Sequence, residues 1–153
     1  MDRWISRHGP LAARILLAHI FLISGLIKIF KYSETKAYME SAGLAPVDLF
    51  LVLAILIEVI GGLSLLLGFA SRATAWVLAF YLLPVTLAFH QFWNATGAQV
   101  QQQQVEFMKN LAIIGGLLAM TTASAGELSL DALHPSWFER LAHPFHRKGP
   151  HAA

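Results

Sequence analysis

The chain has 153 residues, of which 56% are hydrophobic and only 13% are charged. A soluble domain carries about 25% charged residues, so this composition predicts an integral membrane protein. The length indicates a single membrane domain covering 1–153. The formal net charge of +2 is too small to indicate nucleic-acid binding. The absence of cysteine excludes disulfides, thiolate nucleophiles and thiolate metal sites.

Four stretches are long and apolar enough to cross a bilayer, which takes about 20 mostly apolar residues. They cover 10–30, 49–70, 73–93 and 108–125. Because lipid offers no hydrogen bonds to the backbone, these stretches are predicted to be helices. The expected fold class is therefore all-α, a bundle of four transmembrane helices. The segment 94–107, which includes a glutamine tract, is expected to be an exposed loop.

The distribution of Lys and Arg predicts that both chain ends lie on the inner side of the membrane. In this orientation most of these cations lie inside, and the four lysines Lys28, Lys31, Lys36 and Lys109 lie outside. The last segment, 127–153, contains Trp137 and Phe138 flanked by His and Arg. This pattern is typical of an amphipathic tail at the membrane interface.

Glu58 is the only charged residue between Leu49 and Ser71. A carboxylate near the middle of a bilayer costs roughly 2.5–3.5 kcal/mol on insertion scales, so it normally faces protein or a water-filled cavity. Two interpretations remain open. Glu58 forms an ion pair that only fixes the helices, or it belongs to a ligand or proton site.

Residues three or four positions apart share a helical face, and each predicted span places polar residues on one face. We expect one polar cluster in the outer half, with Glu58 and His90 as catalytic candidates, because histidine titrates near neutral pH. Lys109, Asn110 and Lys28 are the candidate ligand-binding residues there, and Arg14 and Arg72 form a separate inner pair of cations. The sequence leaves open whether Lys28 or Lys109 pairs with Glu58. It predicts no metal site, because the histidines of the tail match no ligand spacing.

Glycines in the spans are interpreted as packing positions, because a missing side chain lets two helices approach closely in lipid. The residues concerned are Gly25, Gly61, Gly62, Gly115 and Gly116.

An ordered set of residues between Arg14 and Leu118 resembles the DoxX family of small four-helix membrane proteins. The set comprises Arg14, Phe21, Gly25 and Lys28; Glu58, Gly61, Gly62, Leu66, Gly68 and Arg72; His90, Phe92 and Trp93; and Phe107, Lys109, Asn110, Leu111, Ala112, Gly115, Gly116, Leu117 and Leu118. The resemblance implies a bacterial inner-membrane protein. Family members resemble subunits of a thiosulfate:quinone oxidoreductase or membrane partners in redox and detoxification complexes. The family has no agreed catalytic residues to carry over.

The favoured hypothesis is an accessory membrane subunit of a quinone-linked, sulfur or oxidative-stress redox system. The sequence leaves the cofactor open, with a quinone as the candidate, and the chain has no haem, iron–sulfur or nucleotide-binding motif. Such a subunit needs a partner protein or a homo-oligomer, as well as the lipid bilayer. The alternatives are a non-catalytic scaffold or assembly partner, and a small-solute or proton pathway. No nucleic-acid partner is expected.

Overall fold

The computed structural model describes residues 2–133. Within that range the chain is all helical and has no strand, which confirms the predicted fold class. The helices are α1 (Asp2–Phe30), α2 (Tyr32–Ser41), α3 (Val47–Leu67), α4 (Ser71–Phe89), α5 (Gln99–Thr122) and α6 (Leu130–Leu133). Four segments are long and apolar enough to cross a membrane: Trp4–Phe30, Val47–Leu67, Ser71–Phe89 and Gln99–Thr122.

Three helix boundaries differ from the predicted spans by four residues or more. The first helix begins at Asp2 instead of residue 10, and the third ends at Phe89 instead of residue 93. The last long helix begins at Gln99, so the glutamine tract is helical and the predicted loop over 94–107 is wrong for its second half. Glutamine has a helix propensity close to that of leucine, whereas hydropathy detects only the part of a helix that suits lipid. At these ends the boundary of the helix therefore differs from the boundary of the apolar stretch.

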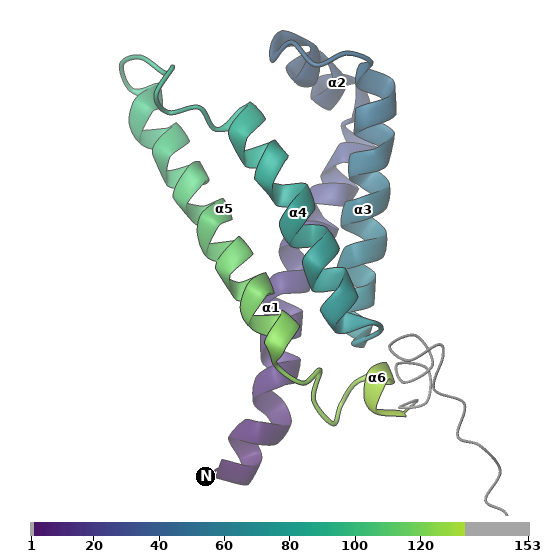
Figure 1. Cartoon of the computed structure of the whole chain (residues 1–153). Helices are drawn as coiled ribbons and strands as arrows, with labels where there is room; N and C mark the ends of the chain where they lie inside the picture. Colours follow the sequence, from purple (N-terminus) through teal and green to yellow (C-terminus); the bar gives the residue numbers. More distant parts are fainter. Residues whose placement is uncertain (1, 134–153) are drawn as a thin grey trace, which may run out of the picture.

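The four long helices form two antiparallel pairs (Figure 1). In one pair α1 packs along α3, in the other α4 packs along α5, and α3 and α4 join the two pairs. We call the end of the bundle that carries α2 the α2 end, and the opposite end, near α6, the Arg14 end. At the Arg14 end, α1 extends beyond the other helices (Figure 1).

The core of the bundle is small and apolar. It centres on Ala18, Phe21, Leu65, Leu78 and Leu117, which are at most 3% exposed. Large apolar side chains also cover the outside: Leu16 is 66% exposed, Ile60 is 62% exposed and Phe80 is 63% exposed. Apolar residues on both the inside and the outside of a helix bundle are what a lipid environment requires.

Three of the predicted packing glycines lie where helices approach closely. A Cβ atom added at Gly25 would lie 2.7 Å from Val59 Cγ2, and one at Gly62 would lie 2.8 Å from Leu22 Cγ. At both positions α1 lies against α3. Gly61 instead faces α4, where an added Cβ would lie 2.8 Å from Leu78 Cδ2.

The two glycines of α5 behave differently from each other. Gly116 faces Leu17 of α1, where an added Cβ would lie 3.3 Å from Leu17 Cδ2. A Cβ at Gly115 would meet no atom within 4 Å, so Gly115 does not pack against the chain's own described helices.

The turn between α3 and α4 is short because Gly68 ends α3 in the left-handed conformation, with a φ of 68°. Left-handed glycine is a common helix terminator, since only glycine adopts this conformation without steric cost. The amide of Gly68 donates to the carbonyl of Leu65, and that of Phe69 donates to the carbonyl of Ser64. A Cβ at Gly68 would overlap the guanidinium of Arg14.

Candidate functional site

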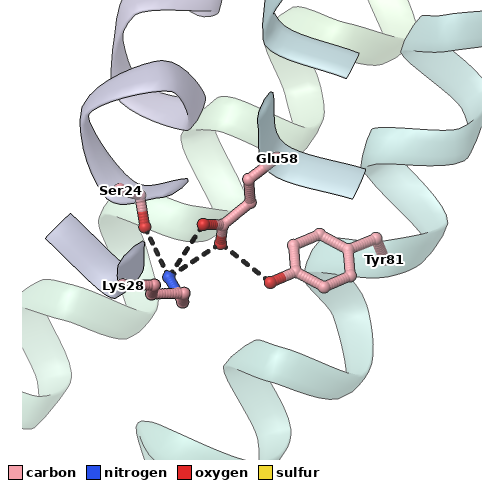
Figure 2. Close-up of polar contacts among 4 residues, drawn as sticks. All are labelled: Ser24, Lys28, Glu58 and Tyr81. Atoms are coloured by element: carbon pink, nitrogen blue, oxygen red, sulfur yellow. Dashed lines mark hydrogen bonds and ion pairs between the residues drawn. The ribbon is translucent and has the colours of Figure 1, made fainter. Parts of the chain in front are cut away.

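Three helices contribute to a buried polar group around Glu58, which we call the Glu58 cluster (Ser24, Lys28, Glu58 and Tyr81; Figure 2). Lys28 Nζ donates to Glu58 Oε1 at 2.9 Å and to Glu58 Oε2 at 2.8 Å. Tyr81 donates its hydroxyl proton to Glu58 Oε1 at 2.8 Å, and Lys28 also donates to Ser24 Oγ at 2.7 Å. The Glu58 side chain is only 6% exposed and that of Lys28 is 20% exposed.

Local structure explains why these side chains meet. On α1, Lys28 lies three residues after Gly25, whose missing side chain lets α1 approach α3 beside Glu58. On the other side, Glu58 and Tyr81 each lie eleven residues from the Phe69–Ala70 turn. Because α3 and α4 run antiparallel from that turn, equal distances along the chain place the two residues at the same depth.

The partner of Glu58 is Lys28, which answers the question that the sequence left open. Lys109 instead pairs with Glu106 on its own helix, at 2.8 Å, and its side chain is 53% exposed. A carboxylate with a cation and two kinds of hydrogen-bond donor is well satisfied, because charge-assisted hydrogen bonds are the strongest in proteins. The cluster therefore supplies hydrogen-bond partners to a carboxyl group inside a membrane-spanning bundle.

The expected cluster of residues from all four spans does not form. His90 lies just after α4 and its Nδ1 contacts Gln103 Oε1 at 3.1 Å. Nine residues separate His90 from Tyr81, which is about 13 Å along a helix. Asn110 is half-buried on α5 and takes no part in the hydrogen bonds to Glu58. The catalytic role of His90 stays a prediction, without direct contact to Glu58.

Arg14, predicted to be one of two inner cations, is only 1% exposed and binds backbone carbonyls. It donates to the carbonyl of Leu66 at 3.1 Å and to that of Leu128. The second predicted cation, Arg72, is exposed, and its Nε donates a long hydrogen bond of 3.4 Å to the carbonyl of Ala123. These contacts tie α1 to the end of α3 and to the segment before α6, and ligand binding at Arg14 stays a prediction.

The segment after α5 lies at the Arg14 end and is fixed there by Asp131. Its carboxylate accepts hydrogen bonds from the amides of Ala70 at 2.7 Å and Ser71 at 2.9 Å. A carboxylate at the first amides of a helix satisfies unpaired donors and the helix dipole. We call Arg14, Asp131 and these backbone partners the Arg14 clasp. Trp137 and Phe138 of the predicted interfacial tail lie outside the described residues.

Sequence reasoning missed Tyr81 and Ser24. Tyr81 lies in an apolar run between Phe80 and Leu82. In such a run the sequence suggests an aromatic side chain that faces lipid. The signal that could have found Tyr81 is its distance from the turn, which equals that of Glu58. Ser24 lies one helical turn before Lys28 on the same face. Among residues 2–133, no three His, Asp or Glu side chains gather into a group that could hold a metal ion.

Comparison with known proteins decides the family. The family model named DoxX matches residues 9–91. This chain belongs to the DoxX family. It is 34% identical over 121 residues to the inner membrane protein YphA of Escherichia coli, covering 79% of this chain and 86% of that protein. It is 39% identical over 125 residues to the inner membrane protein YqjF of the same organism, covering 82% of this chain and 91% of that protein.

A more distant relative is the ER-derived vesicles protein ERV29 of Saccharomyces cerevisiae. It is 27% identical over 109 residues, which cover 66% of this chain and 35% of that protein. No solved structure matches the chain with significance. The two bacterial DoxX relatives and the four apolar helices identify the chain as a multi-pass protein of the bacterial inner membrane.

Proposed function

We propose that this DoxX protein is an accessory membrane subunit of a redox system and that it binds a quinone at the Glu58 cluster. The observation that supports this proposal is a membrane-embedded carboxylate held by two hydrogen-bond donors, Lys28 and Tyr81, from two other helices. Ionisable residues inside a membrane bundle are costly and usually serve function.

The donors of the cluster suit the chemistry of a quinone. A quinone headgroup is flat and apolar except for its carbonyl oxygens, which accept hydrogen bonds. Lys28 has three N–H donors and Tyr81 has one O–H donor, so both can turn from Glu58 toward a carbonyl oxygen. Glu58 can then hold a proton while the headgroup changes its oxidation state.

A partner protein is part of the proposal. Reduction of a quinone to a hydroquinone takes up two electrons and two protons. The electrons would come from a redox group of the partner oxidoreductase, and the protons from the aqueous phase by way of the cluster. The DoxX chain would therefore bind and position the headgroup, and the partner would supply the electrons.

The first test is native mass spectrometry of the protein purified gently from its own membranes. A retained ligand with the mass of a quinone, or a co-purifying oxidoreductase, is the expected result. In the intact complex, Glu58→Gln should abolish quinone-linked activity. The matched variant Glu34→Gln, on the exposed surface of α2, should leave activity unchanged. Full activity in Glu58→Gln would refute the proposal.

A second candidate function, a scaffold without chemistry, is favoured by how completely Lys28 and Tyr81 satisfy Glu58. In that case Glu58→Gln lowers the melting temperature, and native mass spectrometry finds no quinone. A variant that is as stable as the parent but inactive would exclude the scaffold. The solute pathway has less support, since the buried Arg14 binds backbone carbonyls.

A further inference from the structure

A pocket of about 170 Å³ lies at the Arg14 end, between the first turn of α4 and the segment that joins α5 to α6. Three parts of the chain form its walls: Arg72 of α4; Ser124, Ala125, Gly126 and Ser129 of the connecting segment; and Asp131 and Ala132 of α6. Pockets for drug-sized ligands measure about 300–1,000 Å³. This smaller pocket therefore suits a compact polar group whose remaining atoms lie outside it.

The ends of two membrane-spanning helices place the pocket at the surface of the bilayer. Arg72 is the second residue of α4, and α4 is apolar enough to cross the membrane over its whole length. Ser124 comes two residues after Thr122, the last residue of α5. Because α4 and α5 cross the same hydrocarbon layer, which is about 30 Å thick, these two ends lie at the level of the lipid headgroups.

The pocket holds one positive and one negative side chain that do not bind each other. Arg72 and Asp131 both line it, but among residues 2–133 they form no ion pair with each other. Opposite charges that are kept apart on the walls of one pocket match a ligand that itself carries both charges.

The positive side of the pocket suits a phosphate. Arg72 Nε donates to the carbonyl of Ala123, and a guanidinium has five N–H donors, so four are left for an anion. The planar donors of arginine match the geometry of phosphate oxygens. Ser124 adds a hydroxyl group, whose oxygen accepts from the amide of Gly126 and whose own proton is left to donate.

The negative side suits an ammonium group. One oxygen of Asp131 accepts from the amide of Ala70 and the other from the amide of Ser71. A carboxylate has about four lone-pair sites, so about two are left for a further donor. These two amides at the start of α4 are occupied by Asp131, so the group that binds an anion in this pocket is the Arg72 side chain.

An exposed aromatic ridge continues from Arg72 toward the middle of the membrane. Arg72, Trp76 and Phe80 are spaced four residues apart, so their side chains lie one above the other on α4. The rings of Trp76 and Phe80 are stacked with centroids 5.4 Å apart, and both residues are exposed. Trp76 lies about 6 Å from Arg72 along α4, a depth at which tryptophan is common in membrane proteins. The ridge favours a phosphate that is joined to an acyl chain over a free soluble one.

We propose that this pocket binds the headgroup of an aminophospholipid, with its phosphate on Arg72 and its ammonium group on Asp131. In a phosphoethanolamine headgroup a short carbon linker separates the two charges, as the pocket separates its two side chains. The acyl chains lie outside, along Trp76 and Phe80. The bound lipid joins the start of α4 to the segment before α6. This site is separate from the Glu58 cluster and does not depend on the proposed quinone function.

The test uses the full chain in detergent, stripped of lipid, with defined lipids added back. Native mass spectrometry measures the dissociation constants of phosphatidylethanolamine and phosphatidylglycerol with the same acyl chains. Both lipids carry the phosphate, but only phosphatidylethanolamine carries the ammonium group. We expect phosphatidylethanolamine to bind about tenfold more tightly, the factor that one hydrogen bond to a charged group supplies.

Variants assign the two contacts. Arg72→Gln should weaken binding of both lipids about tenfold, because it removes the charge that holds the phosphate. Arg7→Gln is the matched control, since Arg7 is an exposed arginine of α1 at the same end of the bundle and does not line the pocket. Asp131→Asn keeps an oxygen for the amides of α4 and should make the two lipids bind alike. Added phosphatidylethanolamine should raise the melting temperature of Arg7→Gln but not of Arg72→Gln, because a ligand stabilises the folded state that binds it.

Three results would overturn the inference. Equal lipid binding by Arg72→Gln and Arg7→Gln would show that lipids surround the bundle without a defined site. Equal affinity of the parent protein for the two lipids would remove the role of Asp131. Soluble phosphoethanolamine that binds as tightly as the lipid would show that the ligand is a free molecule. None of these results bears on the Glu58 cluster, so this inference and the proposed function fail separately.

Discussion

The Glu58 cluster and the Arg14 clasp both bury charged side chains, but their partners differ in kind. Glu58 binds other side chains, from Lys28 and Tyr81, whereas Arg14 and Asp131 bind backbone carbonyls and amides. Side chains can rotate to a new partner, but backbone groups of a packed turn are fixed in place. The first arrangement suits a site that exchanges partners with a ligand, and the second suits a permanent connection between segments.

This difference explains why two cations of α1, Arg14 and Lys28, deserve different hypotheses. Lys28 keeps a 20% exposed side chain and can leave Glu58 for a carbonyl oxygen. Arg14 is 1% exposed and joins α1, α3 and the segment before α6. The comparison predicts that variants of the clasp change stability and that variants of the cluster change binding.

The largest effect is expected for Arg14→Leu. The substitution removes two hydrogen bonds from a charged donor, each worth about 1.5–3 kcal/mol, so we expect a loss of roughly 3–6 kcal/mol of stability. Thermal unfolding in detergent micelles measures the change. Arg72→Leu is the control, because exposed substitutions usually stay within about 0.5 kcal/mol. Equal stability of Arg14→Leu and Arg72→Leu would contradict a structural role for the clasp.

The next effect tests whether the cluster can be replaced as a unit. Glu58→Leu leaves Lys28 without its counter-charge, and we expect a loss of about 2–3 kcal/mol. Removing one partner of a fully buried ion pair costs about 3–5 kcal/mol. The loss expected here is smaller, because Lys28 is partly exposed. Adding Lys28→Met should restore most of the stability, since apolar pairs often replace buried ion pairs without cost.

The double variant should nevertheless bind no quinone, which separates stability from binding. Melting temperature and binding of a short-chain benzoquinone are measured on the same preparation. A double variant that still binds the benzoquinone would show that the cluster is not the quinone site.

A smaller effect is expected for Asp131→Ala at the clasp. Loss of a helix-capping side chain costs about 0.5–2 kcal/mol. Hydrogen exchange should become faster at the amides of Ala70 and Ser71, which lose their acceptor. Glu127→Ala is the control, since the Glu127 side chain is exposed and lies 3.7 Å from Arg7. Unchanged exchange at Ala70 and Ser71 would argue against the cap.

The smallest effect concerns the ion pair that holds α2 to the start of α3. The hydrogen bond from Lys36 to Asp48, at 2.7 Å, raises the pKa of Lys36 above its usual 10.5. A raised lysine pKa stabilises the folded state fully below the unfolded value and no longer does so once pH exceeds the folded pKa. Lys36→Met should remove this alkaline loss in a pH series of melting temperatures. An identical pH series for Lys36→Met and the parent would exclude the effect.

The positions of the helices and the buried face of α1 could be predicted from the sequence. The contacts between helices could not. Hydropathy located four spans, and the spacing from Arg14 through Ala18 and Phe21 to Lys28 marked a face that is buried or half-buried. Spacing along one helix does not say how a neighbouring helix is tilted. The lean of α5, which no local pattern encodes, therefore decides that Lys109 does not reach Glu58, whereas its pairing with Glu106 three positions earlier is local to α5.

The same limit applies to Arg14. A cation at the end of an apolar stretch is expected to reach water or headgroups. The segment that covers Arg14 comes from residues 126–133, more than a hundred positions later in the chain. Only the folded arrangement shows that Leu128 supplies a carbonyl for the guanidinium.

Gly68 and Arg14 lie so close together that the residue allowed at one position depends on the residue at the other. Any side chain at position 68 would occupy the space of the guanidinium and would also strain a left-handed backbone. A shorter residue at position 14 would free that space but leave the carbonyl of Leu66 without its donor. Neither residue can change alone at low cost, so DoxX proteins that have lost this arginine should also be the ones in which the turn glycine varies.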